Sequence, residues 1–565
     1  MGLRSALLVV AAWLALALVA FAIAAPRVQA PGLYYDEAFL GQQAKDFFEP
    51  GRGVAHPGST REVELFGRSF PLRNAVYLGS LKSQLLIPVF ALFGADVMVL
   101  RLATLATSLV ALLFVMAWAR RVLGTAAALL GGVLVASDPT GWFLSLHEWG
   151  PFTTLLLCRA AGFWLVTLGW LERRPLAVAL GGLWLGLGIY ARADFLVVLA
   201  GAGLALALVR PDVVREALGA RRRLLVGLAA AIALGAAPML VSAGDLLATS
   251  ASPVLGRRGD LAEKLRVLRS LADGSHFHRL MQVGGRFERS FEVEAPAGGF
   301  GLALAACAGF ALVQGALRLR RRERPGAAAF LLLASLFVTA GTLALPGAVR
   351  AHHLLNALPL PQLLVAQIAV ACWRSVSGRR PAGWAVRSAL ALAAVALLAG
   401  NAARIRDTYA LVTATGGRGW WSDALREPAA ELESDARRRG VSLDWSFHEP
   451  LLFLTHRAKL VEPIWGIRAA ARAEGEWRFA GAAGDVYFVH DREWDLFGFG
   501  PAFLAAARAL AVRRPDALEV RAHRDRAGGI AFHTVRLALD HEIAYRRIFR
   551  IRLRDEDLPG PGTAE

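Results

Sequence analysis

Asp36 and Glu37 are the first acidic residues of the chain, and they lie just past a membrane-length apolar run. They sit near the start of a polar segment, Ala30 to Asn74, which leads on to Lys82 and a further apolar stretch. A carboxylate can take a proton from a hydroxyl group, and an ammonium group can stabilise a phosphate. The sequence therefore predicts that groups able to do both lie on one face of a membrane, near where a lipid phosphate would sit.

Further side chains that could carry chemistry lie in other connections on the same predicted face. One adjoins Asp36 in the sequence, three lie in a connection between two apolar runs, one lies in a tight turn, and the last two are a histidine pair that precedes another apolar run. These candidates are Tyr35, Asp138, His147, Glu148, Arg192, His352 and His353. Ionisable residues near membrane depth are costly unless they line a cavity or a polar surface, so we expect them to converge.

Each candidate also has a structural explanation. Asp36 and Glu37 can be ordinary loop carboxylates, and Lys82 can simply extend its ammonium group to the membrane interface. Glu148 can be a solvated neighbour of an interfacial tryptophan. The histidines have no carboxylate partner at a recognisable ligand spacing, so no metal site is predicted. A divalent cation at Asp36 or Glu148 is left open.

The composition indicates a polytopic membrane protein. The chain has 565 residues, of which 56% are hydrophobic, and its mean hydropathy is +0.45, which exceeds what a soluble core needs. The net charge of +18 falls in short basic clusters between apolar runs, the arrangement that orients helices in a bilayer. We therefore expect membrane lipid, and not nucleic acid, as a partner. Only four of the 63 basic residues are lysines, which draws attention to Lys82.

The positive-inside rule fixes the predicted topology. Residues 6–25 are long enough to cross the bilayer, and we favour an uncleaved first span over a signal peptide that ends at Ala30. Residues 80–93 are short and are interpreted as an interfacial or re-entrant helix. About eleven spans then place every dense arginine cluster on the cytoplasmic side. They are residues 6–25, 97–119, 122–137, 151–171, 176–190, 195–209, 224–243, 300–317, 327–345, 353–373 and 388–401.

This topology divides the chain into a membrane domain, residues 1–403, with an external first loop over 30–74, and a C-terminal domain, residues 404–565, outside the membrane. The C-terminal part is polar and charged, with apolar runs at 441–447, 451–454 and 485–489, and helical character over 501–512. Mixed strands and helices predict a small α/β domain. We find no catalytic motif in it.

The order of these motifs resembles that of the C-type (GT-C) glycosyltransferases. It is most similar to the family-39-like branch, which includes protein O-mannosyltransferases and the bacterial aminoarabinose transferase of lipid A. The resemblance covers about residues 1–400. It rests on Tyr35-Asp36-Glu37-Ala38 after a span, Tyr77-Leu78-Gly79-Ser80-Leu81-Lys82-Ser83, Arg101-Leu102 at the start of a span, His147-Glu148-Trp149-Gly150-Pro151, and His352-His353-Leu354-Leu355.

The resemblance implies a GT-C-like fold and an enzyme that moves a sugar from a polyprenyl phosphate to a lipid, glycan or protein acceptor. It implies the periplasmic face of the bacterial inner membrane, with the C-terminal domain in the periplasm. Asp36, with Glu37 as second candidate, would be the base or orienter for the acceptor hydroxyl. The donor phosphate would be bound by Lys82, Arg192, His352 and His353. Glu148 departs from the family, in which aspartate is commoner, so the role of its loop is open.

The chemistry of such a transfer agrees with these residue types. A phosphate leaving group requires no nucleotide, so a Gly-rich nucleotide loop is not needed. Inversion by direct attack is expected, because no second carboxylate has the placement of a nucleophile. Two alternatives come from other classes of protein. A transporter or flippase for a lipid-linked substrate should carry its functional charges within spans, and a non-catalytic assembly protein would act through its C-terminal domain.

Overall fold

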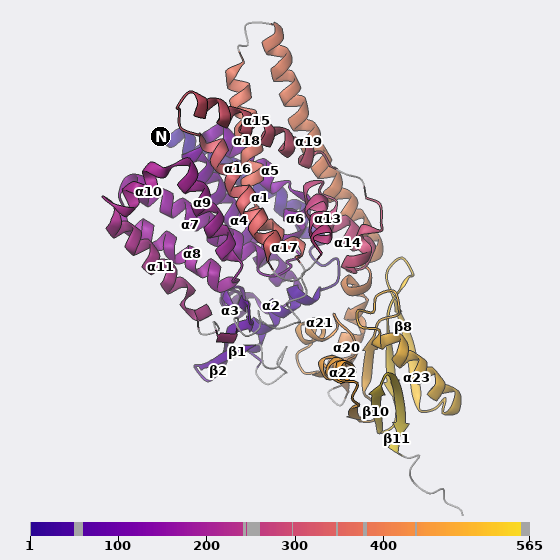
Figure 1. Ribbon diagram of the computed structural model, residues 1–565. Coiled ribbons are helices and arrows are strands. Elements are labelled where there is room, and N and C mark those ends of the chain that lie inside the picture. Colours follow the sequence, from indigo (N-terminus) through magenta and orange to yellow (C-terminus); the bar gives the residue numbers. More distant parts are fainter. Residues whose placement is uncertain are drawn as a thin grey trace, which may run out of the picture.

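The computed structural model describes residues 2–49, 60–240, 244–245, 260–295, 298–345, 349–376, 381–435 and 438–554. It shows a bundle of apolar helices joined to a C-terminal domain that contains strands and helices (Figure 1). The protein is therefore a polytopic α-helical membrane protein with an additional α/β part, as the composition and the charge pattern predict.

Within its described residues, the membrane part contains seven helices long and apolar enough to cross a bilayer, or up to nine if two bent pairs each count as one span. The predicted number of about eleven is reached only when the two shorter helices α5 and α8 are added. The seven are α1 (Leu3–Ala24), α4 (Val97–Val122), α7 (Phe152–Glu172), α11 (Arg222–Leu240), α15 (Phe300–Arg320), α16 (Ala327–Ala344) and α19 (Pro381–Thr415). The bent pairs are α9 (Phe195–Val209) with α10 (Pro211–Leu218), and α17 (Ala351–Leu354) with η3 (Leu355–Ala357) and α18 (Leu360–Ser375).

Local sequence explains where several of these helices begin and end. The Asp96 carboxylate accepts a hydrogen bond from Val99 N at 2.9 Å and so caps α4. Proline occupies the first turn of α6 (Pro139–Leu144) and α8 (Pro175–Ala191), where its missing N–H costs nothing. The 13 residues of α3 (Leu81–Phe93) are too few to span a bilayer, in agreement with the sequence interpretation. The remaining short apolar helix is α5 (Thr125–Ala136).

The polar segment after α1 is more ordered than its composition suggests. It contains the helix α2 (Tyr35–Asp46), most of whose residues are buried even though many are polar. An antiparallel sheet follows, formed by β1 (Arg61–Leu65), β2 (Arg68–Ala75) and β3 (Leu78–Gly79). Residues 50–59 of this segment lie outside the described residues. Asp36 and Glu37 occupy the first turn of α2, where negative charge complements the helix dipole.

Two helices and a short helical turn follow α11 and precede α15 in the chain. They are α13 (Leu261–Ala272), α14 (His276–Gln282) and η2 (Phe287–Phe291). In Figure 1 α13 and α14 lie beside the lower part of α19, toward the C-terminal domain. Helix α14 packs against α19 and α6.

The C-terminal domain is built on a five-stranded sheet of order β5-β4-β7-β9-β8, in which β4 is parallel to both of its neighbours. Helix α19 continues to Thr415 and leads into this domain. The apolar run at 451–454 lies within a helix, and the helix predicted over 501–512 is present as α23. The strands of the large sheet are β4 (Arg439–Ser442), β5 (Lys459–Val461), β7 (Val486–Val489), β8 (Leu518–Arg524) and β9 (Ile530–Leu537). The smaller antiparallel sheet has β6 (Trp477–Gly481), β10 (His541–Arg546) and β11 (Ile548–Leu553). The helices of the domain are α20 (Arg426–Ser434), α21 (His448–Leu454), α22 (Ile464–Arg472) and α23 (Phe499–Arg513). Two short helical turns, η4 (Gly419–Trp421) and η5 (Asp423–Leu425), precede them.

Candidate functional site

Asp36 lies at the start of α2 with its side chain partly exposed. The Trp149 side chain lies close enough to act on its carboxyl group. Burial raises the pKa of Asp36 to about 7, although the neighbouring Trp149 side chain acts to lower it. A carboxyl group that titrates near neutral pH is suited to remove a proton from a hydroxyl group.

Lys82, at the start of α3, forms a buried ion pair with Glu148 and donates a hydrogen bond to Thr104 Oγ1 at 2.7 Å. Glu148 is itself fixed, because its Oε1 accepts from the backbone N–H of Thr153 at 2.6 Å and from Thr153 Oγ1 at 2.7 Å. Since Trp149 contacts Asp36 and Glu148 contacts Lys82, two consecutive residues join the predicted base and the predicted phosphate-binding lysine.

Glu37 is held in a closed ion pair with Arg101 of α4, at 2.7 Å from Nε and 2.9 Å from Nη2. The same guanidinium also donates to the carbonyl oxygens of Val28, Pro31 and Gly32, at 2.9, 2.9 and 3.1 Å. Both side chains are buried. Glu37 and Arg101 therefore anchor the chain that leads into α2, and this geometry favours Asp36 over Glu37 as the group free to react.

A second polar network is formed around Asp194 at the turn between α8 and α9. Asp194 Oδ1 accepts from Arg192 Nε at 2.6 Å, and its Oδ2 faces His353 Nδ1 at 2.9 Å and accepts from Asn356 Nδ2 at 3.0 Å. Arg192 Nη2 donates to Asn356 Oδ1 at 3.0 Å and to the carbonyl oxygen of His352 at 3.1 Å. Burial acts to raise the pKa of Asp194, but Arg192 and His353 outweigh it and hold that pKa below its ordinary value.

Buried donors remain free in this network. Arg192 is 1% exposed, and its Nη1 has no hydrogen-bond partner within the described part of the chain. The same holds for Nδ1 of His352, whose ring lies 5.4 Å from that of Trp149. A Cβ atom at Gly150 would lie 3.5 Å from Arg192 Nη1 and 3.5 Å from His352 Cδ2. The loop after α6, the turn after α8 and α17 therefore meet at one place, with donors available for an anion.

Three other predicted residues have different surroundings. Asp138 caps α6 by accepting from Gly141 N at 2.7 Å and from Gln362 Nε2 at 3.1 Å, so it holds α6 to α18. Tyr35 points to the C-terminal domain, where its ring stacks on Trp445 at 3.9 Å. His147 is fully buried beside Phe143, and burial lowers its pKa well below the ordinary value.

Some residues of the site were not predicted to have a role. Arg159, in the middle of α7, is buried and donates to the carbonyl oxygens of Asn356 at 2.6 Å and Leu355 at 3.3 Å. An arginine within an apolar run was a signal that could have identified it. Trp149 and Asn356 gave no such signal, because a tryptophan near a membrane surface and an asparagine at a helix end are both common.

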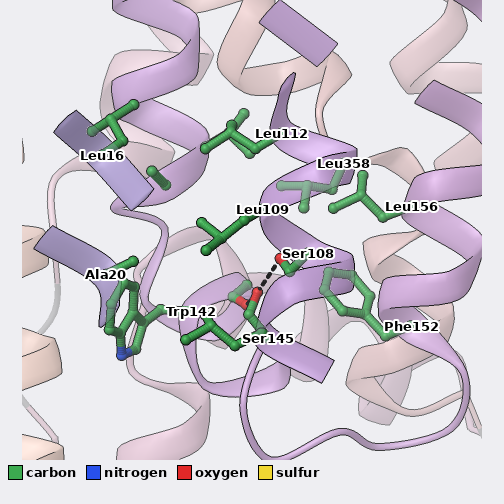
Figure 2. A pocket seen from close by; sticks show the side chains of 14 residues that line it. Leu16, Ala20, Ser108, Leu109, Leu112, Trp142, Ser145, Phe152, Leu156 and Leu358 are labelled. Atoms are coloured by element: carbon green, nitrogen blue, oxygen red, sulfur yellow. Dashed lines mark hydrogen bonds between the residues drawn. The ribbon is translucent and has the colours of Figure 1, made fainter. Parts of the chain in front are cut away.

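An apolar cavity of about 40 Å³ lies between the membrane helices α1, α4, α5, α6 and α7 (Figure 2). Figure 2 shows one hydrogen bond between side chains that line the cavity. It joins the hydroxyl groups of Ser108 and Ser145, which are 2.7 Å apart. Ser145 and Phe152 line it, so the cavity adjoins the loop that carries His147, Glu148 and Trp149. At this volume the cavity is too small to hold an isoprenoid chain.

Among the residues that the structure describes, no cluster of three or more histidine, cysteine, aspartate or glutamate side chains could hold a metal ion.

A family model described as dolichyl-phosphate-mannose-protein mannosyltransferase matches residues 85–241. This range includes Arg101, Glu148, Trp149 and Arg192. Together with the fold, the match confirms the resemblance to the C-type glycosyltransferases that the motifs indicate, and it supports a membrane glycosyltransferase of this type. No curated protein matches the chain.

The particular structures that resemble the chain include ArnT from Cupriavidus metallidurans. The crystal structure of ArnT bound to undecaprenyl phosphate has a TM-score of 0.53 and 13% sequence identity, and the match covers 93% of this chain and 97% of ArnT. The apo structure of the same protein gives a TM-score of 0.50 at 13% identity, with the same coverage. At this identity the likeness establishes the shared fold.

Proposed function

We propose that this protein transfers a sugar from a polyprenyl-phosphate donor to a hydroxyl group of an acceptor. The observation that carries the proposal is the meeting of a partly exposed carboxyl group, Asp36, with buried nitrogen donors at Lys82 and Arg192 through one loop, residues 147–150. The matched family and the ArnT complex with undecaprenyl phosphate support a donor of this class.

In the proposed reaction, the Asp36 carboxylate takes the proton of the acceptor hydroxyl group as its oxygen attacks the anomeric carbon. The bond between that carbon and the phosphate oxygen breaks, and the electron pair leaves with the polyprenyl phosphate. Lys82 and the free Nη1 of Arg192 stabilise the added negative charge on the phosphate. Direct attack on one face with departure from the other inverts the anomeric configuration.

The other site residues act on these groups. Trp149 orients the Asp36 carboxyl group, and Glu148 holds the Lys82 ammonium group. Asp194 and Asn356 fix the Arg192 guanidinium, and His352 supplies a further nitrogen beside the loop. We place the reaction at the periplasmic face of the bacterial inner membrane, with the C-terminal domain on the same side.

The charges of the membrane helices argue for an enzyme and against a transporter. A transporter needs charged groups that change partners between states. Arg101 and Arg159, which lie within α4 and α7, are both bound to backbone carbonyls of neighbouring segments, and Arg101 is also paired with Glu37. Arg192 Nη1 and His352 Nδ1, the free nitrogens nearest the loop of Trp149 and Gly150, lie instead in connections between the helices.

The test uses protein reconstituted in lipid nanodiscs with undecaprenyl phosphate that carries a pentose, a hexose or an amino sugar. Membrane extract from a deletion strain supplies the acceptor. We expect the release of undecaprenyl phosphate from one donor and the appearance of its sugar on an extract component. Absence of release from every donor, with an unchanged glycolipid and glycoprotein profile in the deletion strain, would contradict the proposal.

A further inference from the structure

Helix α2, which carries Asp36, is held by the C-terminal domain. It packs mainly on α21 of that domain and on α3, and Figure 1 shows α21 next to α2 below the membrane helices. A Cβ atom at Gly41 would lie 2.8 Å from the ring of Phe453, so the two helices approach so closely that only glycine fits. The C-terminal domain is thus in direct contact with the helix that carries the proposed base.

The end of α2 is fixed by Lys45, which is one of the four lysines of the chain. Its Nζ is buried and donates to the carbonyl oxygens of Phe453 at 2.8 Å and Thr455 at 2.7 Å. Glu49 Oε2 lies 3.8 Å away. These carbonyl groups are at the end of α21, where backbone oxygens lack helical partners and the helix dipole favours a cation. A buried ammonium group therefore ties the last turn of α2 to the last turn of α21.

The beginning of α2 is fixed by aromatic rings. Tyr35 stacks on Trp445, which follows β4, with centroids 3.9 Å apart. Tyr34 stacks on Trp421, which follows α19, at 4.3 Å. The backbone N–H of Gly32 also donates to the carbonyl oxygen of Trp421 at 2.8 Å. The two residues that precede Asp36 are thus both packed against rings of the C-terminal part.

We propose that the C-terminal domain positions the Asp36 carboxyl group for the reaction, and that Lys45 and Trp445 are the positioning residues through which it acts. This inference rests on the proposed function. It gives a role to a domain that shows no catalytic motif of its own.

The expected consequence is specific to the rate of the chemical step. A misplacement of about 1 Å in a reacting group can lower a rate by about 100-fold. Lys82 is held by Glu148 and Thr104, and Arg192 by Asp194 and Asn356, so loosening α2 from α21 should leave the groups that bind the donor phosphate in place. We therefore expect kcat to fall while KM for the donor stays nearly constant.

The test compares Lys45→Met and Trp445→Leu with the wild type, in the transfer assay and in thermal unfolding. Met replaces the Lys45 stem without its charge. Trp445 is partly exposed, so Trp445→Leu should fold even if Lys45→Met does not. The matched control is Arg439→Met, which removes the ion pair of Arg439 with Asp485, 3.1 Å from Nε to Oδ1, at the other end of β4. Arg439→Met should destabilise the C-terminal domain at a position that does not contact α2.

We expect kcat to fall about 10- to 100-fold in both test variants, with KM for the donor within about twofold of the wild type. Arg439→Met should keep a near-normal kcat at a similar loss of thermal stability. Unchanged kcat in the folded test variants, or an equal loss of kcat in the control, would overturn the inference. If the wild type itself transfers no sugar, the proposed function fails instead, so the two outcomes are distinguishable.

Discussion

Trp149 acts on the Asp36 carboxyl group and lowers its pKa, while the residue before it, Glu148, pairs with Lys82. One dipeptide therefore connects a group that can accept a proton with a group that can bind a phosphate. The second half of the site, around Arg192, touches the same loop at Gly150. Predictions follow from each of these contacts.

The pH dependence of kcat should reflect Asp36. Its pKa of about 7 means that the carboxylate form, which acts as base, becomes predominant above neutral pH. We therefore expect kcat to rise as the pH rises through about 7. Trp149→Phe removes an indole N–H that acts to lower this pKa, so the rise should move to higher pH. A rate that falls with pH over this range, or the same profile in Trp149→Phe, would exclude Asp36 as the titrating base.

Loss of Lys82 should chiefly weaken the use of the donor. Lys82→Ala alone leaves Glu148 buried without its cation, which can cost about 3–5 kcal/mol of folding free energy. The double variant Lys82→Met with Glu148→Gln removes both charges and separates binding from stability. We expect a raised KM for the donor in both, measured with undecaprenyl-phosphate sugar. An unchanged KM would show that Lys82 serves only to hold the loop.

Glu37→Gln should act on stability. The substitution leaves the Arg101 guanidinium buried without a counter-ion, so we expect a loss of about 3–5 kcal/mol in the free energy of unfolding. Thermal unfolding in detergent measures the effect, and conditions that keep the variant folded should restore much of its transfer rate. Normal stability together with lost transfer would instead assign Glu37 to the chemistry.

Glu449 in α21 should make stability depend on pH. Burial, followed by Glu462 and Asp46, raises its pKa well above the ordinary value of 4.5. Since the folded chain holds this proton more tightly than the unfolded chain, the stability it contributes is lost as the pH rises through the folded pKa. Glu449→Gln should therefore gain thermal stability relative to the wild type as the pH rises from 4.5 through the folded pKa of Glu449.

The control for this prediction is Glu474→Gln, because the Glu474 side chain is 76% exposed. It should leave the pH dependence of the unfolding temperature unchanged. The prediction would be contradicted if the unfolding temperatures of the wild type and of Glu449→Gln changed in parallel with pH.

Much of the site could be predicted from the sequence because its charges interrupt apolar patterns. Asp36, Lys82 and Arg192 stand out for this reason, and the structure brings them to one loop. The same pattern could not separate Asp36 from Glu37, because the distinction depends on Arg101, distant in sequence. The burial of α2 was also hidden, since the partners of its Lys45 are the carbonyl oxygens of Phe453 and Thr455 in the C-terminal domain, distant in sequence.

The measurement that tests the account most directly is the sugar transfer rate of Asp36→Asn in nanodiscs, beside the wild type and with the same undecaprenyl-phosphate donor. Asparagine keeps the size of the side chain and removes its basicity. We predict a loss of about 10²- to 10⁴-fold in kcat, with normal thermal unfolding and normal binding of undecaprenyl phosphate. Transfer by Asp36→Asn at close to the wild-type rate would contradict the account.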